Sequence, residues 1–230
     1  LSRLNRLIER VIKAYEEYTF HTIYHSIHNF CTVDLSALYL DIVKDRIYVE
    51  KKDALKRRAS QTVIYETLMS LVKIISPILS TTSEEMWQYL KGKDDPESIF
   101  LCDFPQAKKE LIDLSLEEEW EKIWKIREIV NKKIEEKRSE KILGHPLDAK
   151  VTIQAKDEDY RILTKLGDEI KDIFIVSQVF IETHSETIIT VSRADGKKCQ
   201  RCWQYSVDLT PPHARFPEVC KRCEDILSSL

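Results

Sequence analysis

The chain has 230 residues, of which 43% are hydrophobic and 33% are charged, and it contains only four glycines. This composition supports a folded core with long solvated helices, arranged as one large domain or two small ones. The formal net charge of −3 argues against a protein that binds nucleic acid over its whole surface, so any such binding must come from local basic patches.

Charged residues run through positions 1–20, so this stretch has no signal-peptide core, and no apolar run in the sequence is long enough to span a membrane. Cys31 and Cys102 have no partner at a meaningful spacing, and we interpret them as small buried hydrophobic residues. Together these features indicate a cytoplasmic protein.

Apolar residues recur at three- and four-residue steps over the first 95 residues, which is the pattern of amphipathic helices. Helices are predicted over residues 2–18, 20–30, 34–43, 51–76 and 82–90. Asp34 is the expected N-cap of the third helix, and Pro77 ends the fourth. Thr82 and Glu85 form a capping box that opens the fifth. Five helices with short connections predict an antiparallel helical bundle.

Two polar patterns on these helices have competing interpretations. His21, His25 and His28 lie on one helical face, but no carboxylate stands among them as a further metal ligand, so we interpret them as hydrogen-bonding residues at helix contacts. The basic run at 51–58, which includes Arg57 and Arg58, is either a solvated helix face or a contact for RNA. A solvated face is the commoner interpretation of such runs.

The character of the sequence changes after the fifth helix. Glycine and proline residues mark 91–113 as a linker, with a short extended piece at 98–101. Ser115 and Glu118 then form a second capping box, which opens a long amphipathic helix.

A period-two pattern replaces the helical pattern beyond Leu147. Apolar and polar residues alternate at 151–155, as is typical of a half-buried strand. Strands are predicted at 151–155, 173–181 and 187–191, and a helix at 157–166. Residues 139–195 therefore predict a small α+β unit of three strands and one helix.

Two Cys-x-x-Cys hooks carry the most specific signal in the sequence. Cys199 and Cys202 form the first hook, and Cys220 and Cys223 form the second, with seventeen residues between them. In each hook, two intervening residues let both sulfurs turn toward one point, and Zn²⁺ accepts four thiolates in a tetrahedron. Two disulfides or a redox motif are the alternatives, but a redox hook explains only one pair. We therefore predict one structural Zn²⁺, because four thiolates leave no open position for water.

No catalytic constellation accompanies the cysteines. The sequence contains no Gly-x-Gly-x-x-Gly or Gly-x-x-x-x-Gly-Lys loop for phosphates, no Gly-x-Ser-x-Gly elbow and no His-Glu-x-x-His motif. Its carboxylates gather mostly on solvated helix faces. The chain is therefore predicted to be a binding module without catalytic residues.

Several segments of the helical part, together with the hooks, resemble one known family. The helical segments are FHTIYHSIHNFC at 20–31, DLSALYLD at 34–41, KDRIY at 44–48, RRASQTVIY at 57–65, SPIL at 76–79, EEMWQYL at 84–90 and the pattern RxxVNKxxExxR at 127–138. They closely resemble the anticodon-binding domain of class I isoleucyl-tRNA synthetases. Valyl, leucyl and methionyl relatives share this helical part in outline. The hooks, with Trp203 directly after Cys202, are similar to the C-terminal zinc module of the bacterial-type isoleucyl enzymes.

The resemblance covers essentially the whole chain but only the C-terminal portion of the family. The family's His-Ile-Gly-His-like and Lys-Met-Ser-Lys-Ser-like motifs and its editing domain have no counterpart here. The resemblance implies a fragment of a longer, monomeric ligase that joins isoleucine to its tRNA using ATP. ATP would bind the catalytic domain of the same chain, which this fragment lacks, so the fragment alone is expected to have no catalytic activity.

The resemblance also implies a mainly α fold with a definite domain order. We expect a helical-bundle anticodon-binding domain at 1–95, a linker and long helix at 96–138, a small α+β subdomain at 139–195 and a zinc ribbon-like module at 196–230. The tRNA specific for isoleucine is the expected partner, held by its anticodon arm.

Side chains suited to unpaired anticodon bases gather in the zinc module. Such bases stack on aromatic and guanidinium planes, and residues 197–222 contain six basic residues against two acidic ones. A locally positive lobe on a chain of negative net charge suits the docking of a tRNA arm. The predicted RNA-binding residues are Arg201, Trp203, Lys221, Arg222, Arg57 and Arg58.

Two other functions stay open at this point. Glycosylases that excise oxidised purines carry a related zinc hairpin, but they need an N-terminal Pro-Glu pair, whereas this chain begins Leu-Ser-Arg. A structural zinc scaffold that binds a protein partner is the second alternative. Binding assays with isoleucine tRNA and with duplex DNA separate all three functions.

Overall fold

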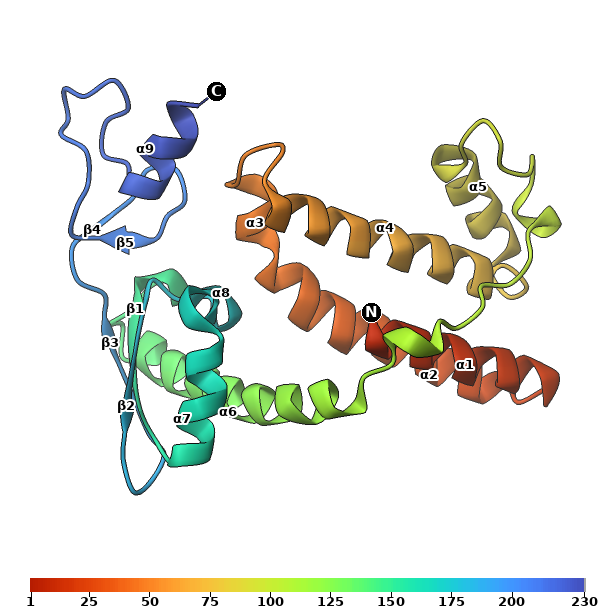
Figure 1. The fold of residues 1–230 in the computed structure, drawn as a ribbon, viewed down its shortest axis with the longest axis horizontal. Helices are drawn as coiled ribbons and strands as arrows, with labels where there is room; N and C mark the ends of the chain where they lie inside the picture. The colour runs from red at the N-terminus through yellow and green to blue at the C-terminus, as the bar shows by residue number, and fades with distance from the viewer. Residues whose placement is uncertain (230) are drawn as a thin grey trace. The chain divides into compact units, whose positions relative to one another are not determined.

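A computed structural model of the chain describes residues 1–229, and the chain divides into two compact units. Unit 1 comprises residues 1–41 and 53–117, and unit 2 comprises residues 42–52 together with the chain from 118 onward. Figure 1 labels the helices and strands of both units. The division of the sequence into four domains stays a prediction.

Unit 1 consists of helices, as the apolar periodicity predicts. Its elements are α1 (Ser2–Glu16), α2 (Phe20–Asn29), the π-helix η1 (Phe30–Leu40), α4 (Leu55–Ile75), α5 (Ser80–Leu90) and the 3₁₀ turns η2 (Ile99–Leu101) and η3 (Lys109–Leu111). The stripe of α1 packs with α2 and α4 in one core, which includes Leu4, Leu7, Ile8, Val11, Ile23, Leu71 and Ile74. A second core joins α4 to α5 through Val72, Trp87 and Ile99. None of the described helices combines the length and hydropathy that a membrane span requires.

The predicted linker at 91–113 is held along the helices of unit 1 by hydrogen bonds. The indole N–H of Trp87 donates to the carbonyl of Pro96 at 2.9 Å, and the Asn5 side-chain oxygen accepts from the backbone N–H of Lys108 at 2.8 Å. The predicted extended piece at 98–101 is wrong, because residues Ile99–Leu101 form a 3₁₀ turn. The hydroxyl of Ser98 accepts from the N–H of Phe100 at 3.3 Å and thereby caps that turn.

Two predicted helix caps in unit 1, at Asp34 and Thr82, are wrong. Asp34 lies inside η1, which follows α2 without a break, and its carboxylate pairs with Arg3 of α1. Helix α5 begins at Ser80, before the Thr82 box, because the N–H of Leu79 bonds to the carbonyl of Ile75 and carries the chain directly into the next helix.

The long helix α6 (Leu114–Ser139) also begins earlier than the sequence indicates. Its cap is the Asp113 carboxylate, which accepts from the N–H of Leu116 at 2.9 Å. Ser115, the predicted cap, lies in the first helical turn. A carboxylate near the first turn is favourable because the helix dipole is positive there.

Unit 2 contains a three-stranded sheet in the order β2-β1-β3. Its strands are β1 (Ala149–Ala155), β2 (Gln178–Thr183) and β3 (Ile188–Arg193), and its helices are α3 (Lys44–Tyr48), α7 (Asp157–Lys165), α8 (Ile170–Phe174) and α9 (Lys221–Leu227). Strand β1 pairs in parallel with β2 and antiparallel with β3. A parallel pair needs a crossover connection, and α7 and α8 supply it.

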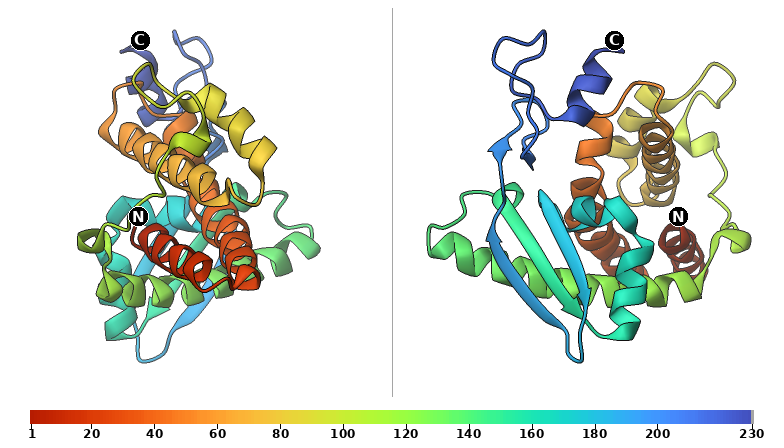
Figure 2. Two further views of the ribbon diagram at one scale, coloured as in Figure 1. Left: turned by 90° about the vertical axis from the view of Figure 1, so that its right-hand side faces the viewer. Right: turned by 60° about the vertical axis from the view of Figure 1, so that its left-hand side comes forward.

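One face of the sheet carries the core of unit 2. The residues of β1 alternate between buried and half-buried, so the predicted half-buried strand is confirmed. The buried face forms one cluster with α6, α7 and α8, and this cluster includes Ile123, Ile126, Val130, Ile134, Val151, Ile153, Leu163, Phe174 and Val191. In the right panel of Figure 2 the green α6 passes behind the sheet. The mainly α fold with a small α+β part is thus confirmed, but this part contains two helices, α7 and α8, where the sequence predicts one.

The predicted strand at 173–181 is partly wrong. Ile173 and Phe174 end α8, and Ile175 then takes the left-handed conformation with φ of 56°. The strand begins only at Gln178. The apolar run was ambiguous because a buried helix end and a buried strand have the same composition.

Candidate metal centre

The first cysteine hook forms the turn of a short hairpin. Strands β4 (Lys197–Lys198) and β5 (Tyr205–Ser206) pair antiparallel on either side of it. The N–H of Trp203 donates to the carbonyl of Cys199 at 3.0 Å, and Trp203 itself lies in the left-handed region with φ of 66°. This turn directs both sulfurs of the hook to one side.

The second hook opens helix α9. Cys220 is the N-cap of that helix, and Cys223 follows in its first turn. The N–H of Cys220 donates to the sulfur of Cys199 at 3.3 Å, so the backbone of the second hook contacts a sulfur of the first. A hairpin turn and a helix start thus bring the four cysteines together.

The four sulfur atoms lie within 4.8 Å of one another, and none is in a disulfide. A tetrahedron of sulfurs around Zn²⁺ with bonds of roughly 2.3 Å has edges of about 3.8 Å. The Cys202 and Cys220 sulfurs are 3.7 Å apart, close to such an edge and far beyond a disulfide bond. The cluster therefore fits one structural zinc, as predicted.

Hydrogen bonds connect the sulfurs with one another and with a nearby arginine. Hydrogen bonding with Cys202 lowers the pKa of the Cys220 thiol, and the same contact raises the pKa of the Cys202 thiol. The guanidinium of Arg201 donates to the sulfur of Cys223 at 3.6 Å. Donors of this kind support metal ligands and fix their orientation.

The apolar core around the cysteines is small. Its buried members are Val49, Cys199, Cys202, Val219, Cys223 and Ile226. Three of these six are cysteines of the hooks, so the sulfurs themselves form much of the interior. A metal ion at their centre would supply the folding free energy that this small apolar core does not, as in other small zinc modules.

Gly196 begins the hairpin, and its replacement is expected to lower the stability of the zinc module. Its φ is +90°, and a Cβ atom there would stand 2.2 Å from the carbonyl oxygen of Ser206. Because that oxygen belongs to the β4–β5 pair, Gly196→Ala should separate the strands and lower the melting temperature of the zinc module. Gly167→Ala is the matched control, because Gly167 also has positive φ but nothing within 4 Å of the added Cβ.

Thermal melts monitored by tryptophan fluorescence check this prediction. Gly167→Ala should cost on the order of 1 kcal/mol, the typical strain of a left-handed non-glycine residue. Gly196→Ala should reduce the free energy of unfolding by clearly more, since the steric overlap adds to the same strain. Equal melting of the two variants would contradict the prediction.

The structure places Trp203 and Lys221 at the surface of the zinc module. Trp203 is 57% exposed, and the ammonium of Lys198 lies 5.0 Å from the centre of its ring. The Lys221 side chain is 75% exposed and pairs with Glu224 at 3.3 Å and Asp225 at 3.1 Å. Both remain predicted RNA contacts.

The predicted arginine contacts lie in two different settings. Arg201 and Arg222 contact residues 42–52 of unit 2, through Val49 and Asp45. Sequence inspection missed these partners because they lie more than 150 residues earlier and have no local pattern that marks them. Arg57 is half-buried and Arg58 is exposed in the first turn of α4, which belongs to unit 1. All four arginines stay predicted RNA contacts.

The other polar features of the sequence do not form a metal centre. Among residues 1–229, the cysteine cluster is the only set of three or more candidate ligands that converges. His21, His25 and His28 are exposed on α2, where the ring of His28 stacks on Tyr24 at 5.6 Å. Cys31 and Cys102 are half-buried, and burial raises the pKa of both thiols.

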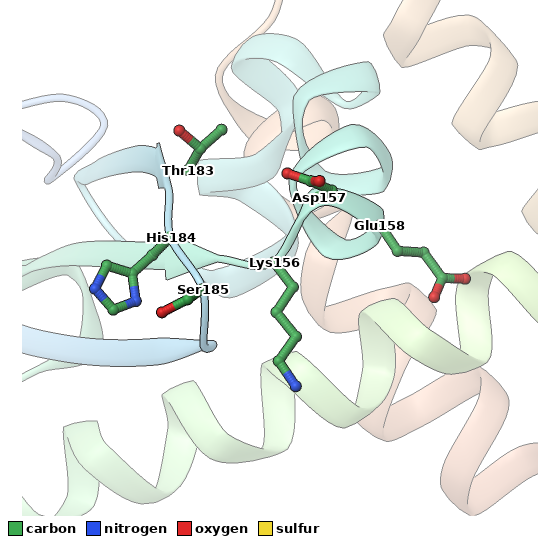
Figure 3. Close-up of a pocket in the computed structure, with 6 residues that line it drawn as sticks. All are labelled: Lys156, Asp157, Glu158, Thr183, His184 and Ser185. Carbon is green, nitrogen blue, oxygen red and sulfur yellow. The ribbon is translucent and has the colours of Figure 1, made fainter.

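An open hollow of about 540 Å³ lies where β1 and β2 end. It is lined by Lys156, Asp157, Glu158, Thr183, His184 and Ser185 (Figure 3). The side chains point in different directions, and Glu158 pairs outward with Lys122. They therefore do not present a convergent set of ligands.

A family model described as the anticodon-binding domain of tRNA ligase matches residues 1–153. The chain belongs to this family. A second model, described as a zinc finger found in FPG and IleRS, matches residues 196–226 and so contains all four cysteines. The predicted resemblance is confirmed over both parts of the chain.

Curated relatives are isoleucine–tRNA ligases. The chain is 47% identical to that of Carboxydothermus hydrogenoformans over 240 residues, which cover 100% of this chain and 26% of the relative. It is 45% identical to that of Caldicellulosiruptor saccharolyticus over 231 residues, covering 99% and 25%. For Thermotoga maritima the identity is 41% over 235 residues, covering 99% and 26%. The chain thus spans about a quarter of the length of the curated relatives it matches.

Proposed function

We propose that this chain is the part of an isoleucine–tRNA ligase that recognises the anticodon arm of its tRNA. The whole ligase would join isoleucine to that tRNA using ATP, in the cytoplasm and as a monomer, and its catalytic domain would lie elsewhere in the same longer chain. The observation that carries the proposal is the combination, in one chain, of the anticodon-binding helices with the four-cysteine zinc finger. A glycosylase would have the second feature without the first.

We further propose that Cys199, Cys202, Cys220 and Cys223 are the ligands of one structural Zn²⁺. The proximity of their sulfurs and the hydrogen bonds to Cys199 and Cys223 support this assignment. The metal would supply folding energy and rigidity, with no role in chemistry, because four thiolates fill its coordination sphere. A rigid hook would hold Trp203 and its neighbours in place for RNA.

The charge of helix α4 supports a second RNA contact at Arg57 and Arg58. The first turn of α4 carries basic residues and no acidic one. Cations near a helix N-terminus oppose the helix dipole, at a cost of about 0.3–1 kcal/mol each. Phosphates of a bound RNA would offset that cost.

Filter binding with three nucleic acids tests the proposed function. The chain should bind the isoleucine tRNA roughly tenfold more tightly than the same tRNA with an exchanged anticodon, a difference of about 1.4 kcal/mol. It should bind a duplex DNA of matched length more weakly than either RNA, and tRNA affinity should fall as salt rises.

The competing functions predict other results for the same assay. A protein-binding scaffold would retain none of the nucleic acids, and a glycosylase-like module would prefer the duplex DNA. Equal affinity for the two tRNAs would contradict anticodon recognition.

A further inference from the structure

Residues 42–52 are part of unit 2, although the residues before and after them belong to unit 1. The segment contains α3 and is fixed at both ends by apolar burial. Ile42 lies in the core that contains the sheet. Val49 is 8% exposed and lies in the core of the cysteine cluster, together with Cys199, Cys202 and Cys223. A segment from the first quarter of the chain thus completes the interior of the zinc module.

An ion pair joins this segment to the helix of the second hook. Arg222, between Cys220 and Cys223, donates to both oxygens of Asp45, with Nη1–Oδ2 of 2.6 Å and Nη2–Oδ1 of 2.8 Å. Glu50 accepts a further hydrogen bond from Arg222 at 3.3 Å. The Arg222 and Asp45 side chains are only 30% and 18% exposed, so water screens the pair weakly. Two parallel hydrogen bonds of this kind fix the relative orientation of the guanidinium and the carboxylate as well as the distance between them.

A second arginine connects the segment to a sulfur of the cluster. Arg201 donates through Nη1 to the sulfur of Cys223 at 3.6 Å and through Nη2 to the backbone carbonyl of Val49 at 2.6 Å. A metal-bound thiolate accepts such a hydrogen bond more strongly than a thiol does. Because the guanidinium is planar and rigid, orientation at the sulfur determines orientation at the carbonyl.

We propose that bound zinc holds residues 42–52 against the zinc module, with Arg201 and Arg222 as positioning residues. We call this arrangement the latch. The proposal rests on the zinc site assigned above. The segment contains Tyr48, which is 78% exposed, and also Lys51 and Lys52. The latch would therefore fix the positions of these side chains for contact with an RNA partner. By linkage, metal and segment stabilise each other by the same factor.

Hydrogen exchange of the full chain, with and without zinc, tests the latch. Removal of zinc with a chelator should speed exchange of the 42–52 amides, including the N–H of Val49 that bonds to the Asp45 carbonyl, by on the order of tenfold. Amides of β1 should keep their protection, which separates local release from general unfolding. Unchanged exchange in 42–52 on zinc removal would overturn the proposal.

A charge-matched pair of variants tests the reverse direction. Asp45→Asn removes the carboxylate that accepts both parallel hydrogen bonds from Arg222, leaving Glu50 at 3.3 Å, and it replaces no residue of the hooks. It should speed zinc release to a chromogenic chelator by on the order of tenfold. Asp53→Asn makes the same change at an exposed residue just beyond the segment and should release zinc like the parent. Equal release from both variants would overturn the latch. Absence of zinc from the purified parent protein would instead refute the metal site itself.

Discussion

Removal of the metal is expected to unfold residues 196–229 while the helices of unit 1 keep their structure. Structural zinc contributes on the order of 10 kcal/mol to small modules, and the core of this one consists of few residues besides its cysteines. Unit 1 has two apolar cores of its own, one with Leu7, Val11 and Ile74 and one with Trp87. Its stability therefore does not depend on the sulfur cluster.

Chelation followed by circular dichroism and limited proteolysis checks this expectation. Most of the far-UV helical signal should persist, since α9, with 7 residues, is the helix that contains a hook cysteine. Proteolysis should become rapid beyond residue 196. The double variant Cys199→Ser/Cys220→Ser should behave like the chelated parent and contain no zinc, where the parent contains one ion per chain.

Cysteines outside the hooks provide the control for this experiment. Cys31→Ser and Cys102→Ser change half-buried thiols in unit 1 and should leave the zinc content unchanged. Loss of most helical signal on chelation would show that the two units do not fold independently. Resistance of the C-terminal region to proteolysis without metal would refute the metal's role as its core.

The sequence predicted those parts of the fold in which local pattern and tertiary packing agree. The stripe of α1 and the alternation of β1 both appear in the structure, because each buries the face that its periodicity marks. The cysteine hooks were equally predictable, since the two Cys-x-x-Cys spacings mark the four sulfurs that converge in the structure. In these cases the local pattern marks the residues that the fold brings together.

Helix starts and long-range partners could not be predicted in the same way. The chain enters η1 and α5 from a preceding helix or turn, so no side-chain cap is needed at Asp34 or Thr82. The pairing of Arg222 with Asp45 joins residues 177 positions apart. Nothing near either residue marks the other, and a basic residue in a zinc hook equally suggests an RNA contact. Only the folded chain shows that its guanidinium already has a carboxylate partner.

Substitution of Trp203 is expected to give the largest loss of tRNA affinity of any change that leaves the fold intact. The hydrogen-bonded turn of the first cysteine hook fixes its backbone, and its ring is 57% exposed beside the ammonium of Lys198. An aromatic plane of this kind stacks on an unpaired base for about 1–3 kcal/mol. Trp203→Ala should therefore weaken binding of isoleucine tRNA by about one to two orders of magnitude, measured by filter binding.

The backbone at this position makes the substitution a clean probe of the ring. Trp203 has φ of 66°, and alanine keeps the Cβ atom that strains this conformation, so the strain is nearly the same before and after the change. Trp203→Phe retains an aromatic plane and should keep most of the affinity. Zinc content and melting temperature should match the parent in both variants. If Trp203→Ala instead loses zinc and stability first, the ring is part of the module's packing. If it binds tRNA like the parent with zinc retained, the module does not contact RNA through this side chain and acts as a scaffold.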